Sequence, residues 1–130
     1  MSRTLINPPT LHPTPGFSHA AIASGKRIVV FAGQTALDPQ FQLIGENDLH
    51  AQTIAAMRNL ETAMRETGIG WDDIVKRTVF TLHPTEFETI TAAIDQVTGA
   101  AAHPPQTLVG VSGLAIPGLL IEIEAMAIAE

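Results

Sequence analysis

The sequence of 130 residues predicts an α+β fold in which two amphipathic helices cover one face of a mixed sheet. Two segments carry apolar residues at the helical period. The other apolar segments are short and β-branched, in the order β-β-α-β-α-β-β. Strands that alternate with only two helices favour one sheet with both helices on one face, which leaves the second face to water or to a neighbouring subunit. Only 15% of the residues are charged, against about 25% in a usual soluble domain, so we expect a subunit there.

The first part of the chain is predicted to be an irregular arm followed by a β-hairpin. Residues 1–16 hold four of the nine prolines, which restrict the backbone and remove amide donors. Residues 17–24 and 27–31 are short apolar runs on either side of Gly25, a pattern typical of two strands joined by a turn. The continuous apolar run at residues 28–31 predicts a strand that is covered on both faces.

A long helix is predicted over residues 49–67. Asp48 is placed to cap its first turn, and Gly68 and Gly70 follow its last turn. Its apolar stripe has the helical spacing of three, three and four residues and consists of Ile54, Met57, Leu60 and Met64.

A second helix is predicted to begin with a capping box, in which Thr85 is the cap and Glu88 lies three residues later. This helix should end at Gly99. Its apolar stripe consists of Phe87, Ile90, Ile94 and Val97.

Three further strands are predicted over residues 74–82, 106–112 and 119–128. In the last strand, alternation puts Glu122 and Glu124 on one face. The opposite face is apolar and consists of Ile121, Ile123, Ala125 and Ala127.

The composition of the chain excludes several classes of function. Its length fits one domain, residues 1–130. The absence of cysteine excludes disulfides, thiol catalysis and thiolate metal sites. The five histidines lack the spacing of metal ligands, so neither a metal nor another cofactor is expected. The net charge of −6 and the scattered basic residues disfavour nucleic acid as a partner. No apolar run reaches the ~18 residues of a membrane span, and no signal-peptide pattern is found, so a cytoplasmic protein is expected.

Three features are candidates for binding or catalysis, and each has an ordinary structural alternative. Gly33 follows a buried strand and would let the backbone approach a ligand, or it serves a bend. The stiff corner at Pro104 and Pro105 would deliver Gln106 to the mouth of a strand, or it reverses the chain. Glu122 or Glu124 would position a water as a general base if partly buried, whereas most strand carboxylates face water.

Several motifs together resemble the RidA/YjgF family, also known as the L-PSP endoribonuclease family. The resemblance runs from residue 7 to residue 128. Its longest motifs are Asp73-Ile74-Val75-Lys76-Arg77-Thr78-Val79-Phe80 and Ile121-Glu122-Ile123-Glu124-Ala125-Met126-Ala127. Shorter ones are Phe17-Ser18-His19-Ala20, Ala32-Gly33-Gln34 and Pro105-Gln106-Thr107-Leu108-Val109.

The resemblance implies a chorismate-mutase-like fold and a homotrimer whose ligand clefts lie between subunits. It also implies hydrolysis of reactive enamines and imines, such as 2-aminoacrylate, to ketoacids and ammonia. In the family an arginine grips the substrate carboxylate, and a glutamate of the last strand holds a water.

Carried over by position, the resemblance makes Glu122 the catalytic glutamate and gives a set of substrate-binding residues. Gln106 takes the place of the arginine and brings no charge, so we expect an atypical substrate. Arg77 or His103 would have to supply the missing charge. The substrate-binding set consists of Phe17, Gly33, Gln106 and Leu108, with Phe17 in the place of a tyrosine and Leu108 contributing its main chain.

Two functional hypotheses follow. The first is a RidA-like hydrolase that deaminates an enamine, an imine or a related small metabolite. The second is a non-catalytic trimer that binds a small metabolite or regulates a partner enzyme. The ribonuclease activity that the family name suggests is disfavoured by the acidic net charge.

Overall fold

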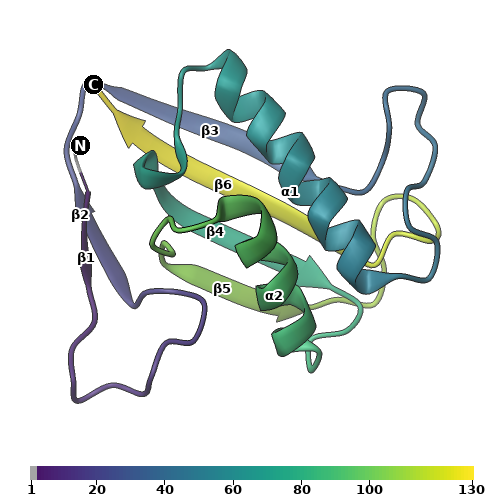
Figure 1. The fold of residues 1–130 in the computed structure, drawn as a ribbon, viewed down its shortest axis with the longest axis horizontal. Coiled ribbons are helices and arrows are strands. Elements are labelled where there is room, and N and C mark those ends of the chain that lie inside the picture. The colour runs from purple at the N-terminus through teal and green to yellow at the C-terminus, as the bar shows by residue number, and fades with distance from the viewer. Residues whose placement is uncertain (1–2) are drawn as a thin grey trace.

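A computed structural model of the chain describes residues 3–130 as six strands, two α-helices and one short 3₁₀-helix (Figure 1). The elements alternate much as the sequence predicts. In chain order they are β1 (Arg3–Ile6), β2 (Ala20–Ala23), β3 (Arg27–Gln34), α1 (Leu49–Glu66), η1 (Trp71–Asp73), β4 (Ile74–Thr81), α2 (Phe87–Thr98), β5 (Gln106–Gly110) and β6 (Ile121–Ala129).

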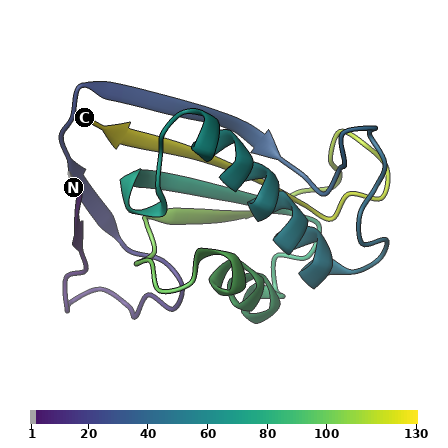
Figure 2. The same ribbon diagram turned by 45° about the horizontal axis from the view of Figure 1, so that its top comes forward.

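The main sheet has four strands in the order β3-β6-β4-β5. It is mixed, because β4 and β5 are parallel whereas β6 is antiparallel to both β3 and β4. Both helices lie on the same face of this sheet, as Figures 1 and 2 show from two directions. The α+β fold with two helices on a mixed sheet is therefore confirmed.

The core lies between the sheet and the two helices. Alternation along β6 puts Ile121, Ile123, Ala125 and Ala127 into this core, and all four are buried as expected. The other face of the sheet is open within the chain. On that face Ile28 and Val30 of β3 are 70% and 72% exposed, so this strand is covered on one face only.

The predicted hairpin is wrong. β2 does not pair with β3; it pairs antiparallel with β1, which forms inside the segment expected to be an irregular arm. The prolines of that arm begin at Pro8, after β1 has ended, so they do not interrupt it. Arg3 fixes β1 to the domain, because its buried guanidinium donates to the carbonyls of Ile74 and Ala102 at 2.6 Å each.

The helix boundaries show one prediction confirmed and one wrong. The Asp48 cap of α1 is confirmed, since the amide of Ala51 donates to Asp48 Oδ1 at 3.0 Å. The capping box at Thr85 is wrong, because α2 begins at Phe87 and its cap position is Glu86, which makes no side-chain cap bond. A turn closed by the Glu86 amide and the His83 carbonyl, at 3.1 Å, holds Thr85 before the helix starts.

The last two strands are displaced from their predicted bounds. β5 ends at Gly110 rather than at residue 112, and β6 runs over Ile121–Ala129 rather than 119–128. The loop between these strands begins at Gly110. A Cβ at this position would be 2.7 Å from Pro84 Cγ, so the glycine permits the close approach of the segment that contains Pro84. No helix within residues 3–130 is long and apolar enough to cross a bilayer.

Candidate functional site

The carboxylate of Glu122 lies against the backbone of Gly33 on the open face of the sheet. Glu122 is half-buried on β6, opposite Phe80 of β4. Gly33 lies where the pairing of β3 with β6 is irregular, between Phe31 and Gln34. A Cβ at Gly33 would be 2.8 Å from both Cγ and Cδ of Glu122 and would overlap its Oε2. Only glycine therefore lets the carboxylate take this place.

Glu124 shares the open face but has different surroundings. It lines a shallow groove of about 210 Å³ between β3, β4 and β6, together with Lys76 and Thr78. Lys76 Nζ donates to Thr107 Oγ1 at 2.8 Å. Glu124 is exposed whereas Glu122 is half-buried, so the two carboxylates are not equivalent.

Gln106 lies at the start of β5, directly beside Arg77 of β4 in the parallel pairing. Arg77 Nε donates to Gln106 Oε1 at 2.5 Å. Arg77 is only 2% exposed, while Gln106 is half-buried. Arg77, a possible source of the missing positive charge, is thus in contact with Gln106.

A chain of hydrogen bonds continues from Arg77 through His103 to Asp95. Arg77 Nη2 donates to the Gly16 carbonyl at 3.1 Å and lies 3.4 Å from His103 Nδ1. His103 Nε2 is 2.6 Å from Asp95 Oδ1. Sequence reasoning missed Asp95, because an exposed aspartate on α2 resembles any other solvated helix residue.

Burial lowers the pKa of two members of this hydrogen-bonded chain, Arg77 and His103. It lowers the pKa of Arg77 to about 10, and the nearby carboxylate of Asp95 opposes the shift. Burial also lowers the pKa of His103, and the positive charge of Arg77 adds to the effect, whereas the hydrogen bond to Asp95 opposes it. Arg77 is therefore charged at neutral pH and His103 is neutral.

Phe17 is brought next to the corner that precedes Gln106. The following residue, Ser18, donates from its amide to the Pro104 carbonyl at 3.1 Å and from its hydroxyl to the His103 carbonyl at 2.7 Å. The Phe17 ring packs between His12 and His19, with ring centroids 6.1 and 5.9 Å away.

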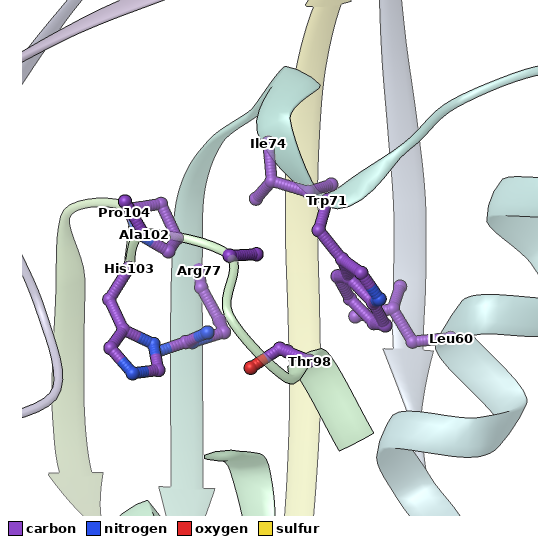
Figure 3. A pocket seen from close by; sticks show the side chains of 9 residues that line it. Leu60, Trp71, Ile74, Arg77, Thr98, Ala102, His103 and Pro104 are labelled. Carbon is purple, nitrogen blue, oxygen red and sulfur yellow. The ribbon is translucent and has the colours of Figure 1, made fainter. Parts of the chain in front are cut away.

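An enclosed cavity beside Arg77 is too small for a metabolite. Its volume is about 10 Å³, close to the minimum for a single water. Figure 3 shows Arg77 and His103 on one side of it and Trp71 and Leu60 on the other. Thr98 Oγ1 is the one buried side-chain polar atom within residues 3–130 that has no hydrogen-bond partner, and it lines this cavity.

The expected site residues form two groups within one chain. Gly33 and Glu122 lie on the open face, whereas Phe17 and Gln106 lie around the first residues of β5, with Gln106 on the helix-covered face. In the strand register, Gln106 lies opposite Arg77 and Glu122 lies opposite Phe80. Arg77 and Phe80 are three residues apart on β4, so the two groups are separated by about 10 Å along the strand. Leu108 packs its side chain against the core, and its strand β5 is an edge of the described sheet.

No group of three or more acidic or histidine side chains within residues 3–130 is placed to hold a metal ion. The side chains and groups that the candidate residues offer are a carboxylate at Glu122, an amide at Gln106, a buried arginine at Arg77 and main-chain groups.

Comparison with known proteins identifies the family. The family model described as Endoribonuclease L-PSP matches residues 9–129. The chain belongs to this family, the RidA/YjgF proteins. The solved structure of the Rid family protein YyfB from Yersinia pestis is 36% identical, with a TM-score of 0.92, and the match covers 98% of this chain and 99% of that chain. The resemblance seen in the sequence is thus confirmed.

Two curated relatives span most of the chain. A RutC family protein from Synechocystis sp. is 32% identical over 117 residues, which are 89% of this chain and 88% of the relative. The 2-iminobutanoate/2-iminopropanoate deaminase of Salmonella typhimurium is 31% identical over 103 residues, which are 78% of this chain and 79% of the deaminase.

Proposed function

We propose that this RidA/YjgF protein hydrolyses a reactive imine or enamine of a small metabolite at clefts between the subunits of a homotrimer. Support comes from the family, from the similarity to an imine deaminase of Salmonella typhimurium, and from the position of Glu122. The products would be the corresponding carbonyl compound and ammonia.

The observation that carries the proposal is the contact between Glu122 and Gly33. A half-buried carboxylate held against the backbone can accept a hydrogen bond from a water and take up its proton as the water attacks. The water oxygen would add to the carbon of the C=N bond, and the first proton would pass to the nitrogen, which gives a carbinolamine. The second proton would leave the new hydroxyl and pass to the nitrogen as the C–N bond breaks, so ammonia departs and a C=O bond remains. An enamine would first take up a proton on carbon and lose one from nitrogen to become the imine.

The trimer is proposed because the open face of the sheet exposes large apolar side chains at its β3 edge and because the candidate residues fall into two groups. Ile28 and Val30 are more than two-thirds exposed, and Met126 is 36% exposed beside them. Ile28 and Val30 would each contribute up to roughly 1.5–3 kcal/mol if a neighbouring subunit covered them, and Met126 would contribute less. Because Glu122 and Gln106 lie on opposite faces of one sheet, a cleft that uses both needs two subunits.

The test is an imine hydrolysis assay. An amino-acid oxidase generates 2-iminopropanoate or 2-iminobutanoate in the presence of semicarbazide, and a deaminase lowers the rate of semicarbazone formation. Further imines made by the same oxidase extend the panel. The turnover of the Glu122→Gln variant should fall by a factor of about 10²–10⁴, and its oligomeric state should be unchanged. Glu124→Gln is the matched control on the same strand and should keep most of the turnover. Equal turnover in wild type and Glu122→Gln would remove Glu122 from the mechanism.

The second candidate function is a non-catalytic metabolite-binding or regulatory trimer. The observation that favours it is the burial of Arg77, whose Nε and Nη2 donors are directed to groups of the chain itself, so it does not offer the carboxylate clamp of a typical deaminase. A protein that binds small carbonyl compounds, read as a melting-temperature shift, but hydrolyses no imine of the panel would establish this function instead.

A further inference from the structure

We infer that Gln106, oriented by Arg77, binds an uncharged hydrogen-bond acceptor of the ligand, such as the carbonyl oxygen of an amide or ester, in preference to a carboxylate. This inference names the ligand class of the proposed cleft and rests on that cleft. It concerns binding and does not require turnover.

Arg77 is not available to the ligand. Its side chain is 2% exposed, and its Nε and Nη2 donors are directed to Gln106, the Gly16 carbonyl and His103. A bidentate pair with a carboxylate needs two adjacent donors that face the ligand. Arg77 could offer them only by breaking hydrogen bonds in a buried position.

The positive charge of Arg77 is balanced within the chain by the carboxylate of Asp95. Because Asp95 accepts the hydrogen bond of His103 Nε2, the proton of the neutral ring lies on Nε2. His103 Nδ1 then carries a lone pair and accepts from Arg77 Nη2. The guanidinium is thus connected to the Asp95 carboxylate through one imidazole, and the group as a whole carries no net charge.

Arg77 fixes the orientation of the Gln106 amide. Its Oε1 accepts the hydrogen bond from Arg77 Nε, which fixes Nε2 on the other side of the amide group. Within residues 3–130 no partner accepts a hydrogen bond from this Nε2, and Gln106 is only half-buried. Gln106 therefore presents amide donors, polarised by the arginine behind it, without presenting a charge.

A site of this kind discriminates between two ligands of the same shape. A carboxylate that leaves water needs a counter-charge, and a neutral amide donor does not supply one. A carbonyl oxygen of an amide has a smaller desolvation cost and accepts the same hydrogen bond. The two ligands should therefore differ in affinity although they differ little in volume.

The experiment compares pyruvamide with pyruvate, a pair that differs only in this group. Binding to the full-length protein is measured by isothermal titration calorimetry, or by NMR if the affinity is weak. Pyruvamide should bind about tenfold more tightly than pyruvate, which corresponds to the net value of roughly one hydrogen bond. Pyruvate binding as tightly as pyruvamide would overturn the inference, and so would the absence of binding of both compounds.

The variant Gln106→Met tests the role of the amide donors. A methionine keeps the length of the side chain and adds no charge, but it has no N–H to donate. The ratio of the two affinities should collapse, with pyruvamide losing about tenfold. A merely structural role would weaken both ligands equally and leave the ratio unchanged, which would contradict the inference.

The matched control is Gln40→Met, the same chemical change at an exposed glutamine in the loop before α1. It should leave both affinities and their ratio unchanged. Because turnover is not measured, a protein that hydrolyses no imine can still satisfy this inference. If the protein hydrolyses imines but binds pyruvate more tightly than pyruvamide, the proposed function holds and the inference is wrong.

Discussion

Gly33 is the residue that lets the carboxylate of Glu122 lie against strand β3. The two residues come from neighbouring strands, and a Cβ at position 33 would be 2.8 Å from two carbons of the glutamate side chain. The glycine of β3 and the glutamate of β6 are thus one structural unit, in which the backbone of the first sets the position of the second.

The substitution Gly33→Ala should therefore impair turnover more than folding. The added methyl group displaces the Glu122 carboxylate, and a displacement of about 1 Å in a reacting group can cost roughly 10²-fold in rate. The side chain of Glu122 is flexible at its end, so the melting temperature should change little. The matched control is Gly113→Ala, because a Cβ there meets nothing within 4 Å. Equal turnover in both variants would show that Gly33 does not set the position of the Glu122 carboxylate.

The regular elements of the core could be predicted from the sequence because their signals are local. The apolar stripe of α1 and the alternation of β6 depend on residues within a few positions of each other. The choice of strand partner is not local. β3 pairs with β6, at the far end of the chain, rather than with the nearest apolar run, and no spacing in the sequence indicates this. β1 was missed because four residues that begin with an arginine carry no strand pattern.

The candidate site could be predicted only in part. Family motifs pointed to Gly33 and Glu122, and the structure shows that they are in contact. The resemblance also pointed to position 106 but said nothing of what holds its side chain. The chain from Asp95 through His103 to Arg77 joins α2, a loop and β4, so it exists only after the helix has packed beside the sheet.

The open face of the sheet gives a prediction about assembly. Val30 is 72% exposed and lies opposite Met126, so a carboxylate there would be buried if subunits pack on this face. Val30→Glu should convert the proposed trimer into monomers at micromolar concentration, because an unpaired buried charge costs several kcal/mol. Light scattering after size-exclusion chromatography measures the mass.

A control for this variant is Phe41→Asp. Phe41 is 71% exposed in the loop between β3 and α1, off the sheet face, and aspartate tolerates its positive φ of 66°. This variant should keep the mass of the wild type. A wild-type monomer, or a Val30→Glu protein that still assembles, would contradict packing on the open face.

Gln52 is predicted to be the most sensitive polar residue of α1. It is fully buried, its Nε2 donates to the carbonyls of Gly45 and Gly118 at 3.2 and 3.0 Å, and its Oε1 accepts from the amide of Leu120 at 2.8 Å. Gln52→Leu would leave the Gly118 carbonyl and the Leu120 amide without a partner, whereas the Gly45 carbonyl keeps the amide of Asp48. The free energy of unfolding should therefore fall by about 3 kcal/mol. Urea titration measures it. Gln96→Leu, on the exposed face of α2, should stay within about 0.5 kcal/mol of wild type.

His103 gives the protein a predictable dependence of stability on pH. Its pKa is lowered in the folded state, first by burial and then by Arg77, whereas in the unfolded chain it should be near the usual 6.5. Between these two values the unfolded chain binds more protons, so stability rises with pH. The contribution of the neutral imidazole is complete above the unfolded pKa and is lost as the pH falls through 6.5 toward the folded value. Protonation would also place an N–H on Nδ1, opposite the Nη2 donor of Arg77.

Replacing His103 by glutamine removes the titration and should make this part of the pH dependence disappear. The difference in unfolding free energy between wild type and His103→Gln, measured by urea titration, should be larger at pH 8 than at pH 5. His50→Gln on α1 is the same chemical change outside the hydrogen-bonded chain and controls for the loss of an imidazole elsewhere. A wild-type advantage that grows as the pH falls would mean that the charged imidazole stabilises the fold. Asp95 would then dominate over burial and over the charge of Arg77.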